Sequence, residues 1–138
     1  MNNLANTLGD LGQLDEAAKM KKEVLEKRRR ILGEEHPDTI SAMNNLAITL
    51  GDLGQVDEAA KMLKEVLEKR RRILGEEHPD TITAMNNLAS TLGDLGQLVE
   101  AVGMLEVAVQ KIRLVLGDDH PHKKVAISDL ARYRSAIT

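Results

Sequence analysis

The chain has 138 residues, a formal net charge of −3, no cysteine and a single aromatic residue, Tyr133. The near-balance of charge gives no general attraction to nucleic acids or anionic membranes, so neither is expected as a partner. The lack of cysteine excludes disulfides, thiolate metal sites and a cysteine nucleophile. No apolar run reaches the ~18 residues of a membrane span, and the first ten residues lack a signal-peptide pattern, so we expect a cytoplasmic, intracellular protein.

The sequence repeats with a period of 42 residues, which indicates a tandem array. Repeat 1 (1–42) and repeat 2 (43–84) differ at four positions, and repeat 3 (85–126) keeps the first part of the pattern and then diverges. Residues 127–138 resemble the start of a further repeat and are expected to form a C-terminal cap, with its helix starting near residue 121. No low-complexity segment or linker interrupts the array, so the sequence predicts one domain over 1–138.

Each repeat is predicted to fold as two antiparallel helices. In repeat 2, apolar residues recur every three or four positions from Ile40 to Leu50, which is typical of a helix buried on one side. Gly51 and Gly54 are expected to end this helix, because glycine accepts the left-handed conformation found at helix C-termini. A second apolar stripe, over 59–74, predicts the following helix. The hexapeptide LGDLGQ, present in all three repeats, is therefore predicted to be a helix–helix turn.

The connector EEHPD precedes the next predicted helix. Pro79 suits the first helical position, where its missing N–H costs nothing. His36, His78 and His120 recur one repeat apart, too far from each other to share a metal at bond lengths of about 2 Å, so a role at the helix start is favoured. The local cluster at 118–122 could hold a stray divalent ion, but it is weak evidence for a site.

One helix pair cannot bury both of its apolar stripes, so neighbouring pairs must cover each other. Lys21 replaces Leu63 and Leu105 at a position that no earlier pair covers in repeat 1, and we expect its side chain to lie in water. The last helix carries lysines and arginines, as a terminal cap does. The first helix lacks the HPDTI segment that precedes it in the other repeats, which is consistent with a fragment of a longer array.

The joint pattern NNLA…LGDLGQ…EAA…L…VLGEEHPDT resembles the tetratricopeptide repeat, in the 42-residue variety found in kinesin light chains and in many fungal and bacterial arrays. The glycine that the family places between its two helices is matched by Gly12, Gly54 and Gly96. The small residue of the second helix is matched by Ala17, Ala59 and Ala101. The resemblance implies an all-α, right-handed α-solenoid: a superhelix of antiparallel helix pairs with about three repeats and a C-terminal capping helix. The near identity of repeats 1 and 2 indicates recent duplication or consensus design.

By this resemblance, the face of the first helix opposite its apolar stripe lines a concave groove. In related repeats, the asparagine matching Asn3, Asn45 and Asn87 often hydrogen-bonds the backbone of a bound peptide, a task that suits an amide. Two interpretations stand: these asparagines bind a partner, or they bond to the neighbouring helix or to water. On the same face, position 6/48/90 reads Asn, Ile, Ser. The predicted partner-binding residues are Asn3, Asn44, Asn45, Ile48, Asn86, Asn87 and Ser90.

Other motifs argue against catalysis and nucleic-acid binding. The KRRR runs at 27–30 and 69–72 have glutamates four residues before their members, such as Glu65 before Lys69, which predicts helix-stabilising pairs on a solvated face. No aromatic residues accompany them for base stacking. GDLG lacks the phosphate-loop pattern, and no arrangement of serine, histidine and acid suggests a nucleophile. We therefore expect no enzyme, no cofactor and no metal.

The sequence thus predicts a non-enzymatic scaffold that binds a peptide or helix of a partner protein in the groove lined by the first helices. One alternative is structural, because nearly identical ends could let chains stack weakly head to tail. Another follows from the resemblance to fungal arrays: the chain could be the sensor fragment of a larger, STAND-type nucleotide-switch protein. The chain itself carries no residues for binding a nucleotide.

Overall fold

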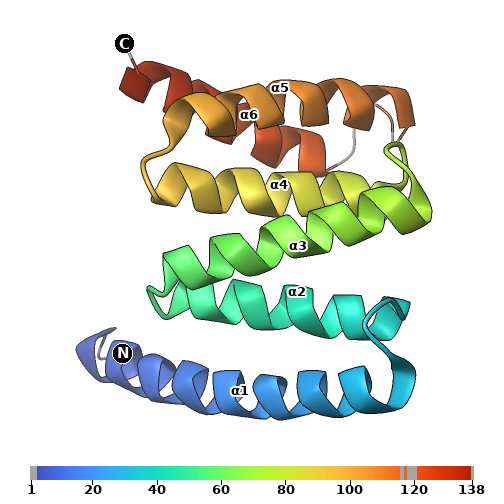
Figure 1. Cartoon of the computed structure of the whole chain (residues 1–138). Coiled ribbons are helices and arrows are strands. Elements are labelled where there is room, and N and C mark those ends of the chain that lie inside the picture. The colour runs from blue at the N-terminus through green and yellow to red at the C-terminus, as the bar shows by residue number, and fades with distance from the viewer. Residues whose placement is uncertain (1–2, 116, 118–120, 138) are drawn as a thin grey trace. The chain divides into compact units, whose positions relative to one another are not determined.

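The computed structural model describes residues 3–115, 117 and 121–137, with side chains from residue 12 onward apart from that of residue 122. Within this part the chain is helical and contains no strand, so the predicted all-α class is confirmed. The helices fall into two compact units, Met1–Met62 and Leu63–Thr138. Figure 1 shows the helices α1 (Asn3–Leu32), α2 (Pro37–Asp52), α3 (Val56–Leu74), α4 (Pro79–Asp94), α5 (Leu98–Val115) and α6 (Pro121–Ile137).

The first compact unit differs from the prediction at its start, because α1 is one unbroken helix where repeat 1 is predicted to form two (Figure 1). Gly12 is predicted to lie at a turn, but it lies inside α1 without a positive φ, whereas the equivalent Gly54 has a φ of 88°. The unbroken helix keeps the backbone hydrogen bonds to residues four positions earlier that a turn at Gly12 would break, and glycine inside a helix costs only about 1 kcal/mol relative to alanine.

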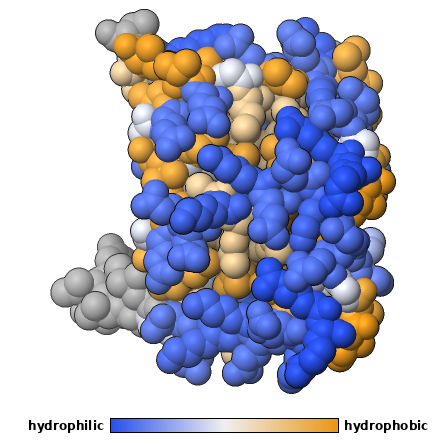
Figure 2. Space-filling model, viewed as in Figure 1, coloured by the Kyte–Doolittle hydropathy of each residue, from blue (hydrophilic) through white to orange (hydrophobic). Residues whose placement is uncertain are grey.

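Helices α1 and α2 pack against each other, and Ala18 and Leu25 are the buried apolar residues of α1 in its described side chains. Lys21 is predicted to lie in water, but its Nζ donates a hydrogen bond of 2.7 Å to Thr49 Oγ1 on α2. The prediction holds in part, because Lys21 is half-buried where Leu63 and Leu105 are fully buried, and its long stem brings the charge to a hydroxyl acceptor. Hydrophilic side chains cover most of the visible side of α1 (Figure 2).

Histidines cap α2 and α4 in the same way. His36 Nδ1 accepts a hydrogen bond of 3.1 Å from the Asp38 N–H, and His78 Nδ1 accepts one of the same length from the Asp80 N–H. Each bond satisfies a backbone donor that has no partner within the helix. The predicted role at the helix start is therefore confirmed for these two histidines. His120 lies outside the described residues.

The LGDLGQ segments of repeats 2 and 3 form the predicted helix–helix turns. Gly54 and Gly96 have φ values of 88° and 81°, the left-handed conformation that glycine adopts at low cost. The Gln55 N–H donates to the Leu50 carbonyl at 2.8 Å and closes the end of α2. Gly51 does not share this role, because it stays within α2 without a positive φ.

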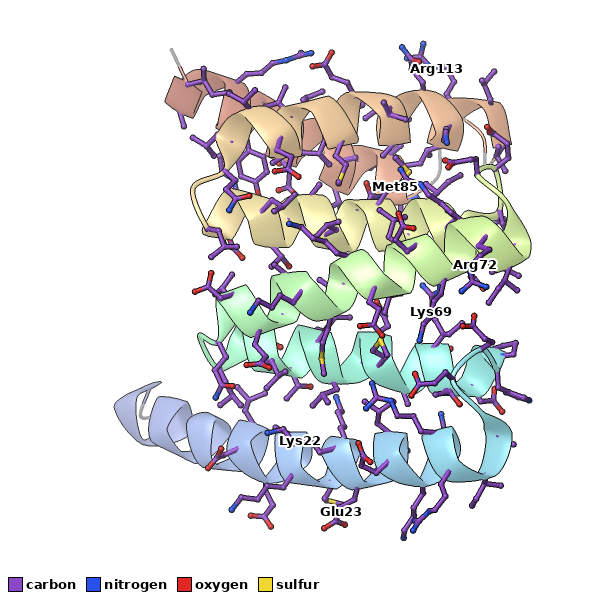
Figure 3. All side chains as sticks on the ribbon, in the orientation of Figure 1. Lys22, Glu23, Lys69, Arg72, Met85 and Arg113 are labelled. Atoms are coloured by element: carbon purple, nitrogen blue, oxygen red, sulfur yellow. The ribbon has the colours of Figure 1, made fainter. Side chains whose placement is uncertain are left out.

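In the second compact unit, α5 packs against both α4 and α6, and α4 also contacts α6. Met85 is buried and points from α4 toward α5, whereas Arg113 lies on the outer side of α5 (Figure 3). Because helices lie on two sides of α5, its apolar stripe is buried from Ala101 to Ile112, whereas Val99 and Leu114 near its ends are exposed. The buried core residues of these helices include Ile82, Met85, Leu88, Leu92, Ala101, Leu105, Ala108, Ile112, Ala126, Leu130 and Tyr133.

The second KRRR run is not the solvated face that the sequence predicts, because Lys69 and Arg70 are buried. Lys69 Nζ forms the predicted pair with Glu65 Oε2, at 3.3 Å. Arg70 Nη1 donates a hydrogen bond of 3.2 Å to the carbonyl of Asp80 at the start of α4. Burial lowers the pKa of the Arg70 guanidinium, and the charge of Asp80 partly offsets this effect. Arg72, farther along α3, is exposed (Figure 3).

Tyr133 joins α6 to the end of α4. Its side chain is buried, and its hydroxyl donates a hydrogen bond of 3.3 Å to the Ser90 carbonyl. The Arg132 guanidinium lies 4.9 Å from the centre of the Tyr133 ring, and its Nη2 donates to the hydroxyl at 3.1 Å. The ring lies so close to Gly93 that a Cβ at that position would overlap ring atoms. This close approach, rather than backbone conformation, requires glycine at position 93.

We expect Gly93→Ala to lower the free energy of unfolding by about 1–3 kcal/mol, because the buried Tyr133 ring would have to move. The matched control is Gly51→Ala in repeat 2, where the added methyl group would lie 3.8 Å from Ala59 Cβ, an ordinary contact. The control should be neutral or stabilising by up to about 1 kcal/mol. Urea unfolding followed by circular dichroism measures both values, and equal effects would contradict the proposed role of Tyr133.

A charged cluster ties the α3–α4 connector to α5. Lys111 Nζ donates hydrogen bonds to Glu76 Oε2 at 2.8 Å and to the Glu76 carbonyl at 3.3 Å, and Arg71 Nε lies 2.9 Å from Glu76 Oε1. The hydrogen bond from Lys111, together with the charges of Lys111 and Arg71, lowers the pKa of Glu76. Repeat 1 has a simpler version of this cluster, an ion pair of 3.0 Å between Arg29 and Glu34.

Because the folded-state pKa of Glu76 is lowered, its stabilising effect exists above the unfolded pKa of about 4.3 and disappears as the pH falls through the folded value. We expect Glu76→Gln to lower the free energy of unfolding at pH 7 by about 0.5–1 kcal/mol, since solvent screens this half-exposed group. Urea titrations at pH 7, 5 and 3 should show the deficit shrinking toward zero at acid pH. Glu23→Gln, on the outer side of α1, is the control, and a deficit in Glu76→Gln that persists at about pH 3 would contradict the assignment.

Candidate partner-binding site

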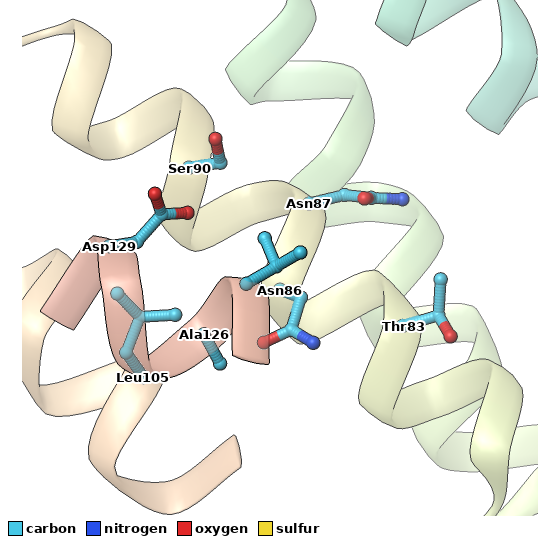
Figure 4. Close-up of a pocket in the computed structure, with 8 residues that line it drawn as sticks. Thr83, Asn86, Asn87, Ser90, Leu105, Ala126 and Asp129 are labelled. Carbon is cyan, nitrogen blue, oxygen red and sulfur yellow. The ribbon is translucent and has the colours of Figure 1, made fainter. Parts of the chain in front are cut away.

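A cavity of about 150 Å³ lies between α4 and α6 in the second compact unit (Figure 4). Helix α4 contributes amide and hydroxyl side chains, α5 contributes one leucine, and α6 contributes small apolar side chains and a carboxylate. The lining is thus apolar on one side and polar on the other. The lining residues are Thr83, Asn86, Asn87, Ser90, Leu105, Val125, Ala126 and Asp129.

The NNLAS segment of α4 places three of the predicted residues in this cavity. Leu88 and Ala89 are buried, while Asn86, Asn87 and Ser90 are half-buried and line the cavity. This division follows from the helical period, which directs residues three or four positions apart to the same face. The apolar residues of the segment therefore hold α4 in the core, and its polar residues line the cavity.

The Asn86 side chain carries a buried oxygen that is free to accept a hydrogen bond. Asn86 Oδ1 has almost no contact with solvent and no hydrogen-bond partner among the described residues. A buried polar atom without a partner costs about 1–3 kcal/mol. A ligand that brought a donor to this atom would recover that cost.

Helices α5 and α6 complete the cavity. Leu105 is fully buried in α5, and α6 adds Val125, Ala126 and Asp129. Asp129 Oδ1 accepts a hydrogen bond of 3.1 Å from Arg132 Nη2. The hydrogen bond to the Tyr133 hydroxyl and the charge of Asp129 raise the pKa of Arg132. The bond between Tyr133 and the Ser90 carbonyl links the two helices that form the walls.

Asp129 is not among the residues predicted from the sequence, although the repeat contains the signal that identifies it. Asp129 lies 42 residues after Asn87, so it occupies the asparagine position of the partial repeat, and α6 is the first helix of that repeat. Val125 likewise occupies the position of Thr83. The cavity therefore lies between the first helices of two successive repeats.

A second, separate cavity, of about 100 Å³, lies in the first compact unit, and Lys21, Val24, Arg28, Ala42 and Asn45 line it. Its α2 residues Ala42 and Asn45 hold the positions that Ala126 and Asp129 hold in α6. This cavity is lined by two cations, whereas the first is lined by a carboxylate.

The structure thus brings together Asn86, Asn87 and Ser90, and it places Asn45 at the second cavity. Asn44 is half-buried and Ile48 is exposed, and neither lines either cavity. The side chain of Asn3 lies outside the described residues.

Among the described residues, no group of three or more histidine, cysteine, aspartate or glutamate side chains is arranged to hold a metal ion. The acidic and histidine cluster at 118–122 lies outside the described side chains. None of the helices in the described part of the chain is long and apolar enough to cross a membrane.

The repeated helix–turn–helix pattern, with a glycine at each described turn and a histidine cap before α2 and α4, defines an α-helical repeat protein. Residues 1–72 and 50–113 match the tetratricopeptide repeat family, and the chain belongs to this family. No curated protein matches the chain.

Solved structures of similar proteins support the same assignment. A Podosopora anserina protein, described as a kinesin light chain with nearly identical TPR-like repeats, shares 30% identity and a TM-score of 0.86 over 97% of this chain. This chain spans 64% of that protein, and a single-substitution variant of it matches equally well. BtubC (BKLC) from P. vanneervenii is 21% identical to this chain, and its TM-score of 0.67 shows a similar fold. The match covers 91% of this chain and 58% of BtubC. The predicted kinesin-light-chain-like tetratricopeptide class is confirmed.

Proposed function

We propose that the chain is a non-enzymatic, cytoplasmic scaffold that binds an extended peptide of a partner protein in the cavity between α4 and α6. The observation that carries the proposal is Asn86 Oδ1, which has no hydrogen-bond partner within the described part of the chain and lies at a cavity that Asn87 and Ser90 also line. Tetratricopeptide repeats are in general protein-interaction scaffolds. The peptide would lie along α4 and meet Ser90 about one helical turn after Asn86 and Asn87.

The size of the cavity favours a peptide over a small-molecule ligand. Pockets for drug-sized ligands and cofactors measure about 300–1,000 Å³, whereas this cavity measures about 150 Å³. It suits one side chain of a longer ligand, with Leu105 and Ala126 as its apolar walls. Asp129 favours a ligand with a hydrogen-bond donor or a positive charge at its side of the cavity.

The amides provide the backbone recognition in this proposal. An asparagine side chain has both donors and an acceptor, so it can pair with the N–H and the C=O of an extended peptide. Asn86 Oδ1 would accept from a peptide N–H, and Asn87 would fix the register of the backbone. Asn3, Asn44, Asn45 and Ile48 would contact the same partner if it continued along the other repeats of a single array over 1–138.

The test is selection of peptides from a random display library with the wild-type chain as bait, followed by affinity measurement with purified peptides. We expect the double variant Asn86→Ala, Asn87→Ala to weaken binding by about 10- to 100-fold, because two hydrogen-bonding side chains that line the cavity are lost. Asp129→Asn should weaken the binding of peptides with a basic residue more than the binding of neutral peptides.

Gln110→Ala provides the control, because it removes an exposed amide from α5 without touching the cavity. Circular dichroism of each variant checks that the fold is kept. Selected peptides that bind the asparagine double variant and the wild-type chain equally well would contradict the proposed site.

A further inference from the structure

The outer side of α5 differs in chemistry from the same side of α3. Five positions of the repeat follow one another at spacings of three or four residues and lie within about 80° of the helix circumference. In α3 all five residues are charged, whereas in α5 none is charged. The five positions hold Asp57, Lys61, Glu65, Glu68 and Arg72 in α3, and Val99, Gly103, Val107, Gln110 and Leu114 in α5.

These five residues of α5 form an exposed, mainly apolar surface, which we call the α5 outer face. Leu114 is 82% exposed, Val99 is 75% exposed, and a Cβ added at Gly103 would have no atom within 4 Å. Arg113, beside this face, lies on the outer side of the helix (Figure 3). The corresponding residues of α3 are exposed as well, although another repeat follows α3 in the sequence. Exposure at these positions is therefore common to the repeats, whereas the loss of charge is particular to α5.

The spacing on the α5 outer face suits contact with a second helix. From Gly103 to Leu114 the spacings are four, three and four residues, as along the seam of a coiled coil. Gly103 has no Cβ, so a second helix could approach closely there. Leu105, which lines the candidate site, lies on the opposite side of α5 from Gly103. A helix packed on the outer face would therefore leave the cavity between α4 and α6 open.

The charges beside the α5 outer face favour a second copy of α5 as the partner helix. Glu100 and Lys111 lie along one edge of this face, and Glu106 and Arg113 lie along the other. In an antiparallel pair each edge meets the same edge of the other copy, so a glutamate lies near a cation on both edges. A parallel pair would instead bring Lys111 beside Arg113. Lys111 and Glu106 also form ion pairs within their own chain, which the new contacts would extend into networks.

We propose that two copies of the chain pair through their α5 outer faces, with the two helices antiparallel and the two-fold axis near Val107. Val107 of each copy contacts its counterpart, and Val99 of each copy contacts Leu114 of the other. The contact uses the same surface of both copies, so it is closed and ends at a dimer. It differs in this respect from a head-to-tail stack, which would continue into longer assemblies.

Sedimentation equilibrium tests the pairing. The wild-type chain should show a monomer–dimer equilibrium without larger species at concentrations up to about 1 mM. Val107→Glu, which introduces the residue that α3 has at this position, should raise the dissociation constant about tenfold or more, because it places two like charges together at the axis. Val24→Glu is the matched control, since Val24 is 41% exposed on α1 and Val107 is 43% exposed, and it should leave the constant unchanged.

Engineered cysteines test the antiparallel register, because the chain has no cysteine of its own. A disulfide requires Cα atoms within about 7 Å of each other. An equimolar mixture of Val99→Cys and Leu114→Cys chains, oxidised slowly, should therefore give mainly the mixed dimer, which its mass identifies. Each variant alone should form little covalent dimer.

Three results would overturn the proposal. A wild-type chain that stays monomeric throughout would leave the α5 outer face to a helix of another protein. Equal effects of Val107→Glu and Val24→Glu would place the dimer contact elsewhere. Cysteine chains that link to themselves as readily as to each other would exclude the antiparallel register. Circular dichroism of each variant checks that the fold is kept.

Discussion

The structure depends on one constraint: a helix of this chain must have its apolar stripe covered by helices on either side. Each fully buried leucine, isoleucine or valine contributes about 1.5–3 kcal/mol relative to an exposed one. Helix α5 meets the constraint, because α4 and α6 lie against it and Ile112 is fully buried. Helix α1 packs against α2, and among its described side chains Val24 is exposed. Repeats with almost the same sequence therefore differ in structure according to their neighbours.

The same constraint shapes the candidate site. Helix α6 is the first helix of a repeat, and it closes the core with Tyr133, whose ring lies against Gly93. Because Tyr133 also bonds to the Ser90 carbonyl, it holds α4 and α6 at a fixed separation. Asn86 Oδ1, at the cavity between them, is buried and has no hydrogen-bond partner among the described residues. The helix pair that closes the core is thus also the pair at which we propose that a peptide binds.

The sequence predicts the helical class, the turns at Gly54 and Gly96 and the histidine caps, because these depend on local patterns. The sequence prediction is wrong at Gly12, where the same six residues form part of a helix. Whether these residues form a turn depends on packing by neighbouring helices, which a local sequence pattern does not show. The sequence prediction is also wrong at Arg70. A run of charged residues is typical of a solvent-exposed helix face, and the run alone does not show that the Asp80 carbonyl lies beside Arg70. Asn86, Asn87 and Ser90 are correctly grouped by helical period, whereas Asp129 joins them only through the packing of α6.

The most direct test of this account compares the three LGDLGQ segments within one molecule. Backbone NMR chemical shifts report whether each residue is helical or lies in a turn. If cover decides the structure, Gly12 and Gln13 should have helical shifts, while Gly54 and Gly96 should have the shifts of the left-handed conformation. Turn-like shifts at Gly12, equal to those at Gly54, would contradict the account, because the local sequence alone would then determine the fold of every repeat.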